Sequence, residues 1–261
     1  MYNIGNILKS VKLFILLLIF LWGFGIMNDN YLEKYVSING DIVSREVLNR
    51  IRVVFFAGLK FAFDRTLALI GLIMFAPIIL IISIAIKLDS KGPVMFRQIR
   101  TGKGGKNINI YKFRSMTVDN DVRDFSVQDK RTKVGLFLRK TSLDEIPQLI
   151  SILKGDMSFI GPRPWIPDYF DNMNEIQRHR YCVRPGLTGL AQANGRNSIT
   201  IFDKINYDLE YIRNYSLIQD IKVIFLTIKT VFTPSSADAG KKVIETELND
   251  LKNQNKEVQV A

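Results

Sequence analysis

Residues 140–164 read Lys140-Thr-Ser-Leu-Asp-Glu-Ile-Pro-Gln-Leu-Ile-Ser-Ile-Leu-Lys-Gly-Asp-Met-Ser-Phe-Ile-Gly-Pro-Arg-Pro164. Apolar residues at helical spacing predict a helix that starts near Asp144 to Ile146 and ends at Lys154, with Gly155 as its C-terminal cap. Its expected apolar face comprises Ile146, Leu149, Ile150 and Leu153. The adjacent carboxylates of Asp144 and Glu145 then meet the positive end of the helix dipole, which keeps them ionised and also favours a nearby phosphate.

A second interpretation of the same residues is a capping box, in which Ser142 caps a helix and Glu145 reaches back to its amide. Pro147 argues against it, because the proline would then lie inside the helix, where it lacks an N–H and crowds the Leu143 carbonyl. Proline is accommodated in the first helical turn, so we place the start further along. An adjacent Asp-Glu pair is more often a solvated surface feature than a site, so its functional interpretation depends on neighbouring motifs.

Composition and charge limit the class of protein. The chain has 261 residues, of which 47% are hydrophobic, and a formal net charge of +11. It can bury one domain-sized core and still supply membrane-contacting segments, and it is not a polytopic transporter. Basic residues concentrate just after an apolar run, at Lys87, Lys91, Arg97, Arg100, Lys103, Lys106, Lys112 and Arg114. This placement indicates anionic lipid headgroups. We expect no nucleic-acid partner, because the sequence has no zinc-ligand spacing, RNA-binding strand motif or recognition-helix pattern.

The chain has a single cysteine, Cys182, and a single histidine, His179. One cysteine excludes an internal disulfide and fits a reducing compartment, where we interpret Cys182 as a buried small hydrophobe. One histidine excludes every multi-histidine metal site, so His179 is interpreted as structural or peripheral.

Two apolar runs suggest contact with a membrane. Residues 13–27 follow two lysines and have no small-residue cleavage site after them, which favours an uncleaved membrane segment over a signal peptide. Residues 66–86 are long enough to cross the hydrocarbon core, but Pro77 lies at their middle. A proline there leaves two alternatives, a re-entrant hairpin and a kinked span, of which we favour the first.

These features give four predicted regions. Residues 1–59 form an N-terminal extension, 60–90 a re-entrant membrane helix broken at Pro77, 91–233 a catalytic domain, and 234–261 a polar tail. The fold class predicted for the domain is a small α/β type with short elements, anchored by the re-entrant helix and by amphipathic surface helices. Within it the patterns predict a strand at 107–115, a loop at 119–133, helices at 168–180 and 205–214, and an amphipathic helix at 218–232 that rests on the membrane.

Several motifs occur in a fixed order along the chain. They are Phe63-Asp64-Arg65, Lys112-Phe-Arg-Ser-Met116, Arg139-Lys-Thr-Ser-Leu-Asp-Glu-Ile-Pro-Gln148, Lys154-Gly-Asp-Met-Ser158, Gly161-Pro-Arg-Pro164, Arg184-Pro-Gly-Leu-Thr-Gly-Leu-Ala-Gln192 and Asn194-Gly-Arg-Asn197. In this order and spacing, over about residues 60–233, the chain closely resembles the bacterial sugar transferase family, the monotopic polyprenyl-phosphate phosphoglycosyltransferases.

The resemblance implies a reaction. A UDP-sugar donates its phosphosugar to polyprenyl (undecaprenyl) phosphate, releasing UMP on the cytoplasmic face of the bacterial inner membrane, with Mg²⁺ as cofactor. The product starts the assembly of a capsule, O-antigen, exopolysaccharide or glycoprotein glycan, which makes downstream glycosyltransferases expected partners. The family's nucleophilic aspartate corresponds to Asp144, and its metal-associated glutamate to Glu145.

Elementary electrostatics agrees with that role. A carboxylate approaches phosphorus only where cations offset the repulsion between the two anions, and Mg²⁺ with Lys112, Arg139, Arg163 and Arg196 offers that offset. Arg163 lies between two prolines, which suits either a pre-positioned phosphate ligand or a plain rigid turn. Glycines 186, 189 and 195 suit either phosphate approach or ordinary turns. A non-catalytic basic membrane scaffold is the alternative function, although a scaffold does not need the Asp-Glu pair.

Overall fold

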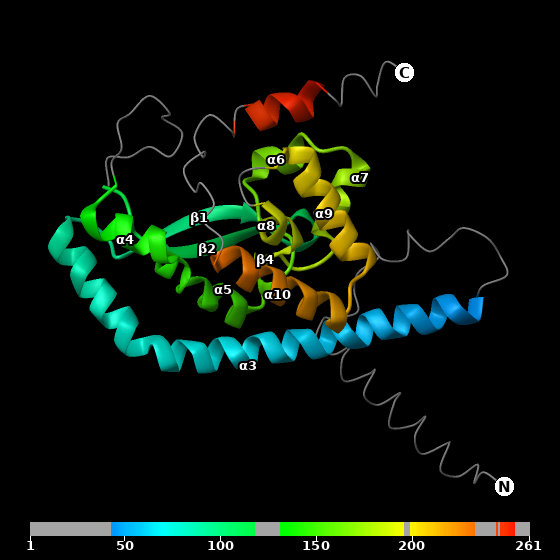
Figure 1. Cartoon of the computed structure of the whole chain (residues 1–261), viewed down its shortest axis with the longest axis horizontal. Helices are drawn as coiled ribbons and strands as arrows, with labels where there is room; N and C mark the ends of the chain where they lie inside the picture. The colour runs from blue at the N-terminus through cyan, green and yellow to red at the C-terminus, as the bar shows by residue number, and fades with distance from the viewer. Residues whose placement is uncertain (1–42, 118–130, 196–198, 233–243, 245, 254–261) are drawn as a thin grey trace, which may run out of the picture. The chain divides into compact units, whose positions relative to one another are not determined.

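The computed structural model describes residues 43–117, 131–195, 199–232, 244 and 246–253 (Figure 1). The chain divides after Ala62 into two compact units, of which Phe63–Ala261 contains the candidate site. The apolar segment 13–27, Arg196 and most of the loop predicted at 119–133 lie outside the described residues.

Helix α3 (Val43–Asp89) contains the second apolar run. Its part Val53–Asp89 is the one helix in the described chain that is long and apolar enough to cross a membrane, with a mean hydropathy of 2.9 over its most apolar 18 residues. The expected break of the helix at Pro77 is wrong, because the helix continues through the proline. Pro77 removes only one backbone hydrogen bond, to the Ile73 carbonyl, and the neighbouring turns keep theirs. Figure 1 shows α3 bending along its apolar part while it stays helical.

The apolar part of α3 packs on the domain at two places. Before Pro77, Ala68 is fully buried in a cluster with Ile108, Ile110, Leu149, Ile152 and Met157. After Pro77, Ile82 and Ile86 are buried in a cluster with Phe113 and Leu138. Between these two places α3 leaves large apolar side chains exposed, among them Ile73, Met74, Leu80 and Ile81. The helix is therefore both a wall of the domain core and an apolar outer surface.

Strands β1 (Met95–Thr101) and β2 (Asn107–Phe113) form an antiparallel hairpin that confirms the predicted strand, two residues shorter at its end. The prediction did not anticipate the role of Arg114. The sequence grouped Arg114 with the basic residues expected at lipid headgroups, but its side chain is buried and donates to the backbone carbonyls of Ser90 and Lys91, both at 2.7 Å. Arg114 thus binds carbonyls just after the C-terminal end of α3, where a cation is favoured.

Strands β3 (Ser158–Ile160) and β4 (Gly186–Thr188) form a second, parallel pair. Three glycines allow the segments around this pair to come close together. A Cβ on Gly186 would lie 2.1 Å from the Gly161 amide nitrogen, and a Cβ on Gly189 would lie 2.3 Å from the Gly161 carbonyl oxygen. In the structure, Gly186 and Gly189 therefore serve close backbone packing.

Helices complete the domain, which is a mixed fold of helices and two small sheets. The helix expected at 168–180 is instead α6 (Pro167–Asp171), α7 (Glu175–Arg178) and a 3₁₀ turn, because Asn174 forms a capping box that starts α7 anew. Helix α9 (Ile201–Arg213) begins four residues before the prediction, at a capping box of Thr200 and Asp203. Helix α10 (Leu217–Phe232) confirms the predicted amphipathic helix and exposes Leu217, Ile218, Ile221, Ile224, Phe225 and Ile228.

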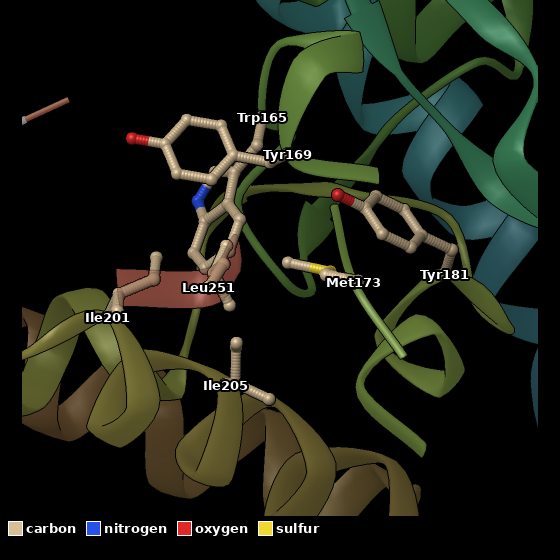
Figure 2. Packing of buried hydrophobic residues seen from close by; sticks show 7 residues of the cluster. All are labelled: Trp165, Tyr169, Met173, Tyr181, Ile201, Ile205 and Leu251. Atoms are coloured by element: carbon tan, nitrogen blue, oxygen red, sulfur yellow. The ribbon is translucent and has the colours of Figure 1, made fainter. Parts of the chain in front are cut away.

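The expected polar tail contains a helix at residues 246–253, drawn in red in Figure 1. Figure 2 shows its Leu251 inserted among Trp165, Tyr169, Met173, Tyr181, Ile201 and Ile205. Leu251 is fully buried there, and Glu247 accepts hydrogen bonds from the Tyr169 hydroxyl (2.7 Å) and from Lys204 (2.6 Å). The described part of the tail thus belongs to the core of the domain.

Candidate active site

A residue with a left-handed backbone conformation turns the chain just before the Asp144-Glu145 pair. Helix α4 (Lys133–Thr141) ends at Ser142, whose φ of 57° makes it the one non-glycine residue with positive φ in the described chain. A 3₁₀ turn over Leu143–Glu145 follows, and α5 (Gln148–Lys154) starts after Pro147. The predicted start was therefore early, while the end at Lys154 with Gly155 in the left-handed region (φ 89°) is confirmed. The Ser142 side chain caps nothing, so the capping-box interpretation is wrong.

Asp144 is buried, with 8% of its surface exposed, so the pair is not a solvated surface feature. Burial raises the pKa of Asp144, and the charge of Lys112 acts in the opposite direction. No side chain of the described residues hydrogen-bonds to this carboxylate. A poorly solvated carboxylate without such donors is more basic and more nucleophilic than one held by them.

Glu145 is held by two cations. Its Oε1 lies 2.5 Å from Lys112 Nζ and 3.3 Å from an Arg163 guanidinium nitrogen. Burial alone would raise the pKa of Glu145, but the charges of Arg163 and Lys112 outweigh it and lower the pKa to about 2. The two adjacent carboxylates thus have pKa values shifted in opposite directions, which is typical of groups with different roles in one site.

Arg139 approaches the same pair from α4. Its Nε donates to the Ser115 hydroxyl at 2.9 Å, and its positive charge acts to lower the pKa of Asp144. Gly135 makes this approach possible, because a Cβ on it would lie 2.1 Å from the Ser115 carbonyl oxygen. The start of α4 is therefore packed directly on the residues that follow β2.

The turn that carries Arg163 is fixed through its backbone. Four hydrogen bonds hold it: Gly161 N to Thr188 O (2.9 Å), Gly186 N to Pro162 O (2.9 Å), an Arg180 guanidinium nitrogen to Arg163 O (2.8 Å) and Thr101 N to Trp165 O (2.8 Å). The flanking prolines restrict φ, as the sequence suggested. These bonds fix the turn on both sides, which leaves the Arg163 side chain pointing to Glu145 with 45% of its surface exposed.

Behind this turn lies a buried ion pair. Arg180 and Asp208 are both almost completely buried, and Asp208 Oδ2 accepts hydrogen bonds from Arg180 Nε (2.9 Å) and from a terminal nitrogen (2.7 Å). The Arg180 guanidinium also stacks on the Trp165 ring at 3.7 Å. Because the same guanidinium binds the Arg163 carbonyl, the pair positions the turn without facing the carboxylates itself.

The structure brings together five of the six predicted site residues: Asp144, Glu145, Lys112, Arg139 and Arg163. The sixth, Arg196, lies outside the described residues. Sequence reasoning missed Arg100 of β1, which lies close enough to Arg163 and Glu145 to be affected by their charges. Side-chain alternation along β1 could have placed Arg100 on the sheet face of Lys112, but only if the register between β1 and β2 were known. Ser115 was also missed, although it lies within the Lys112–Met116 motif, and Arg180 was missed because no motif includes it.

Among the described residues the assembled cluster has more positive than negative charge, with four cations, Arg100, Lys112, Arg139 and Arg163, around Asp144 and Glu145. Such an excess of partly buried cations binds a phosphate or diphosphate well. The described residues hold no group of three or more metal-ligating side chains. Mg²⁺ ordinarily takes only one or two carboxylates and completes its coordination with water and substrate phosphates, so the Asp144-Glu145 pair fits this ion.

Known proteins resemble this chain over a segment that includes the cluster. A family model described as bacterial sugar transferase matches residues 55–234. A UDP-glucose:undecaprenyl-phosphate glucose-1-phosphate transferase of Klebsiella pneumoniae is 46% identical over 202 residues, which cover 73% of this chain and 43% of that protein. A UDP-N-acetylgalactosamine-undecaprenyl-phosphate N-acetylgalactosaminephosphotransferase of Aeromonas hydrophila is 41% identical, covering 68% of this chain and 44% of that protein.

A shorter relative matches over most of its own length. The uncharacterized sugar transferase EpsL of Bacillus subtilis is 42% identical over 175 residues, which cover 66% of this chain and 87% of that protein. The chain thus spans less than half the length of the Klebsiella and Aeromonas relatives. The family match over residues 55–234 contains the Asp144-Glu145 cluster.

Proposed function

This chain belongs to the bacterial sugar transferase family, and on that premise we propose that it transfers a phosphosugar from a UDP-sugar to polyprenyl phosphate and releases UMP. The observation that carries the proposal is the Asp144-Glu145 pair: one carboxylate is buried and accepts no hydrogen bond from a side chain of the described residues, while the other is held by Lys112 and Arg163. A non-catalytic scaffold needs no such pair. The acceptor is undecaprenyl phosphate and the donor is a UDP-sugar, because the named relatives use them.

The chemistry proceeds in two displacements. An Asp144 carboxylate oxygen attacks the sugar-bearing phosphorus of the donor, the bond between the two phosphates breaks, and UMP leaves with the electron pair. A phosphate oxygen of the acceptor then attacks the same phosphorus, which releases Asp144 and leaves a polyprenyl-diphosphate sugar. Lys112, Arg139 and Arg163 offset the repulsion between the carboxylate and the diphosphate in both steps.

Mg²⁺ is the proposed cofactor. Both cations on Glu145 contact the same oxygen, Oε1, so Oε2 is the carboxylate atom that we assign to the metal. Bound there, the ion would supply Lewis-acid neutralisation of the donor phosphates. Lys112 and Arg163 hold the Glu145 carboxylate in place for that purpose.

We further propose that the apolar part of α3 re-enters the membrane without crossing it. The packing of Ala68 and of Ile82 and Ile86 on one domain supports this arrangement, because both ends of the segment then stay on the side of that domain. Exposed apolar side chains of α3 and α10 provide the surface that rests in the bilayer. The domain lies on the cytoplasmic face of the inner membrane, where nucleotide sugars are made and where downstream glycosyltransferases take up the product.

A radiochemical assay tests the function. Full-length protein in membranes is incubated with undecaprenyl phosphate, Mg²⁺ and each of a panel of radiolabelled UDP-sugars, including UDP-glucose and UDP-N-acetylgalactosamine. We expect label to enter the lipid fraction and an equal amount of UMP to form with at least one donor. Transfer of sugar with release of UDP, or no transfer with any donor of the panel, would contradict the proposal.

Glu145→Gln is expected to lower kcat by roughly tenfold or more and to raise the Mg²⁺ concentration needed for half-maximal activity. The change keeps the size of the side chain but removes the charge that pairs with Lys112 and Arg163, and such charge-assisted bonds contribute about 1.5–3 kcal/mol. The measurement is UMP release against Mg²⁺ concentration. Glu175→Gln, an exposed change in α7, is the matched control and should stay within about twofold of wild type. Equal, small effects in both variants would leave Glu145 a structural residue.

Cysteine labelling tests the re-entrant arrangement. In a Cys182→Ser background, single cysteines replace Leu59 and Lys91, since both side chains are exposed whereas Lys60 is buried. An impermeant thiol reagent should leave both positions unlabelled in intact cells and label both after permeabilisation. Labelling of position 59 from outside, with position 91 protected, would establish a helix that spans the membrane.

A further inference from the structure

Arg100 is placed beside Arg163 by the hairpin and by one backbone bond. In the β1-β2 register Arg100 pairs with Ile108, and because side chains alternate along a strand, Lys112 lies on the same sheet face. The next residue in β1, Thr101, donates its N–H to the Trp165 carbonyl at 2.8 Å. This bond joins the end of β1 to the turn that carries Arg163, so two arginines from distant parts of the sequence meet at one edge of the site.

Arg100 donates to a neutral side chain and not to a carboxylate of the described residues. Its guanidinium donates to the neutral Gln98 Oε1 at 2.6 Å, and no carboxylate of the described residues forms an ion pair with it. Burial and, to a smaller extent, the charge of Arg163 lower the pKa of Arg100 to about 10, although Tyr169 and Glu145 act in the opposite direction. The guanidinium groups of Arg100 and Arg163 are neighbours, and the nearby Glu145 carboxylate already binds Lys112. The two arginines are therefore arranged to receive an anion.

The side of the cluster on which Arg100 lies suggests which anion it binds. The charged side chains that act on Asp144 are Lys112, Glu145 and Arg139, whereas those that act on Arg100 are Arg163 and Glu145. The Thr101–Trp165 bond sets Arg100 at the turn of Arg163, which contacts Glu145, whereas Arg139 of α4 acts on Asp144. In an in-line displacement the leaving group departs on the side opposite the attacking atom.

We propose that Arg100 is a further substrate-binding residue, which with Arg163 holds the nucleotide-side phosphate of the donor, the one that leaves in UMP. The proposal rests on the proposed function and names the residue that binds its leaving group. Its guanidinium offers a planar, bidentate phosphate contact that lysine cannot reproduce. Free UMP, which contains only this half of the donor's diphosphate, is then a ligand of the Arg100 subsite.

The test measures product inhibition by UMP in full-length Arg100→Gln and Arg100→Lys proteins, together with kcat and KM for the active UDP-sugar. We expect Arg100→Gln to raise the inhibition constant for UMP and the KM for the donor by roughly tenfold to a hundredfold, the range for a lost bond to a charged group. Arg100→Lys should recover part of this loss. Arg97→Gln is the matched control, because Arg97 is exposed on the opposite face of the same strand, and it should match wild type.

Unchanged UMP inhibition in both Arg100 variants, with wild type active, would overturn the role of Arg100 and leave the proposed function standing. A wild-type protein that releases no UMP would instead overturn the function and this proposal with it. If Arg100→Gln melts well below wild type, Arg100→Lys decides: a Lys variant with wild-type melting temperature and wild-type UMP inhibition makes Arg100 a structural residue.

Discussion

Asp144→Asn is expected to abolish turnover, with kcat falling by more than roughly 10⁴-fold, the order found when a covalent nucleophile is removed. The amide keeps the size and burial of the side chain but has neither the charge nor the nucleophilic oxygen needed to attack phosphorus. Folding should be preserved, because a neutral side chain is easier to bury than a carboxylate. UMP release and the melting temperature of the purified variant, prepared free of wild type, are the two measurements.

A covalent adduct gives a second measure of the same prediction. Wild-type protein incubated with the UDP-sugar alone should gain the mass of one phosphosugar, with proteolytic fragments locating it on Asp144. The Asn variant should gain none, whereas Asp171→Asn, the same chemical change at an exposed position, should behave as wild type. UMP release that strictly requires the acceptor, with no adduct at any time, would favour direct transfer between the two substrates.

The largest expected effect on stability comes from Asp208→Asn. Removing this charge leaves the Arg180 guanidinium buried without a counter-ion, which typically costs about 3–5 kcal/mol. For a domain of this size each kcal/mol lowers the melting temperature by roughly 2–4 °C, so we expect a fall of about 10 °C. The measurement is thermal unfolding in detergent, with Asp171→Asn as the exposed control.

A double replacement separates stability from positioning. Well-packed apolar residues often replace a buried ion pair at little cost, and here the pair itself leaves one Arg180 nitrogen and Asp208 Oδ1 buried without partners among the described residues. We therefore expect Arg180→Met with Asp208→Leu to regain most of the lost stability. Activity should stay low, because the bond to the Arg163 carbonyl is still missing. Full activity in the double variant would show that the pair does not position Arg163.

The local rules of the sequence predicted the α5 segment well. The stop at Gly155 follows from a left-handed cap, and Pro147 correctly excluded a helix that starts at Ser142. The exact start was missed because Ser142 takes a conformation that serine rarely adopts, at about 1–2 kcal/mol, to present the Asp-Glu pair. Tertiary packing of α4 on the residues after β2, through Gly135, compensates for that strain, and no local pattern reveals it.

The parts that sequence did not predict depend on distant partners. The helix at residues 246–253 has too few apolar residues to form a clear stripe, and its Leu251 becomes a core residue only because Trp165 and Tyr169 are there to cover it. Arg100 and Lys112 share a face only in the observed register of the hairpin. Asp144, Glu145, Lys112, Arg139 and Arg163 were found because their motifs lie in short, unusual strings.

The packing of α3 has a consequence for how this protein is made. Residues 63–89 are synthesised before β1, and they already contain Ala68, Ile82 and Ile86, around which the strands and α5 later pack. Since domains fold as the chain emerges from the ribosome, the apolar helix enters the bilayer first, and the rest of the enzyme then folds against it. An excised domain starting after Asp89 would lack part of its own core, so anchor and enzyme are one cooperative folding unit.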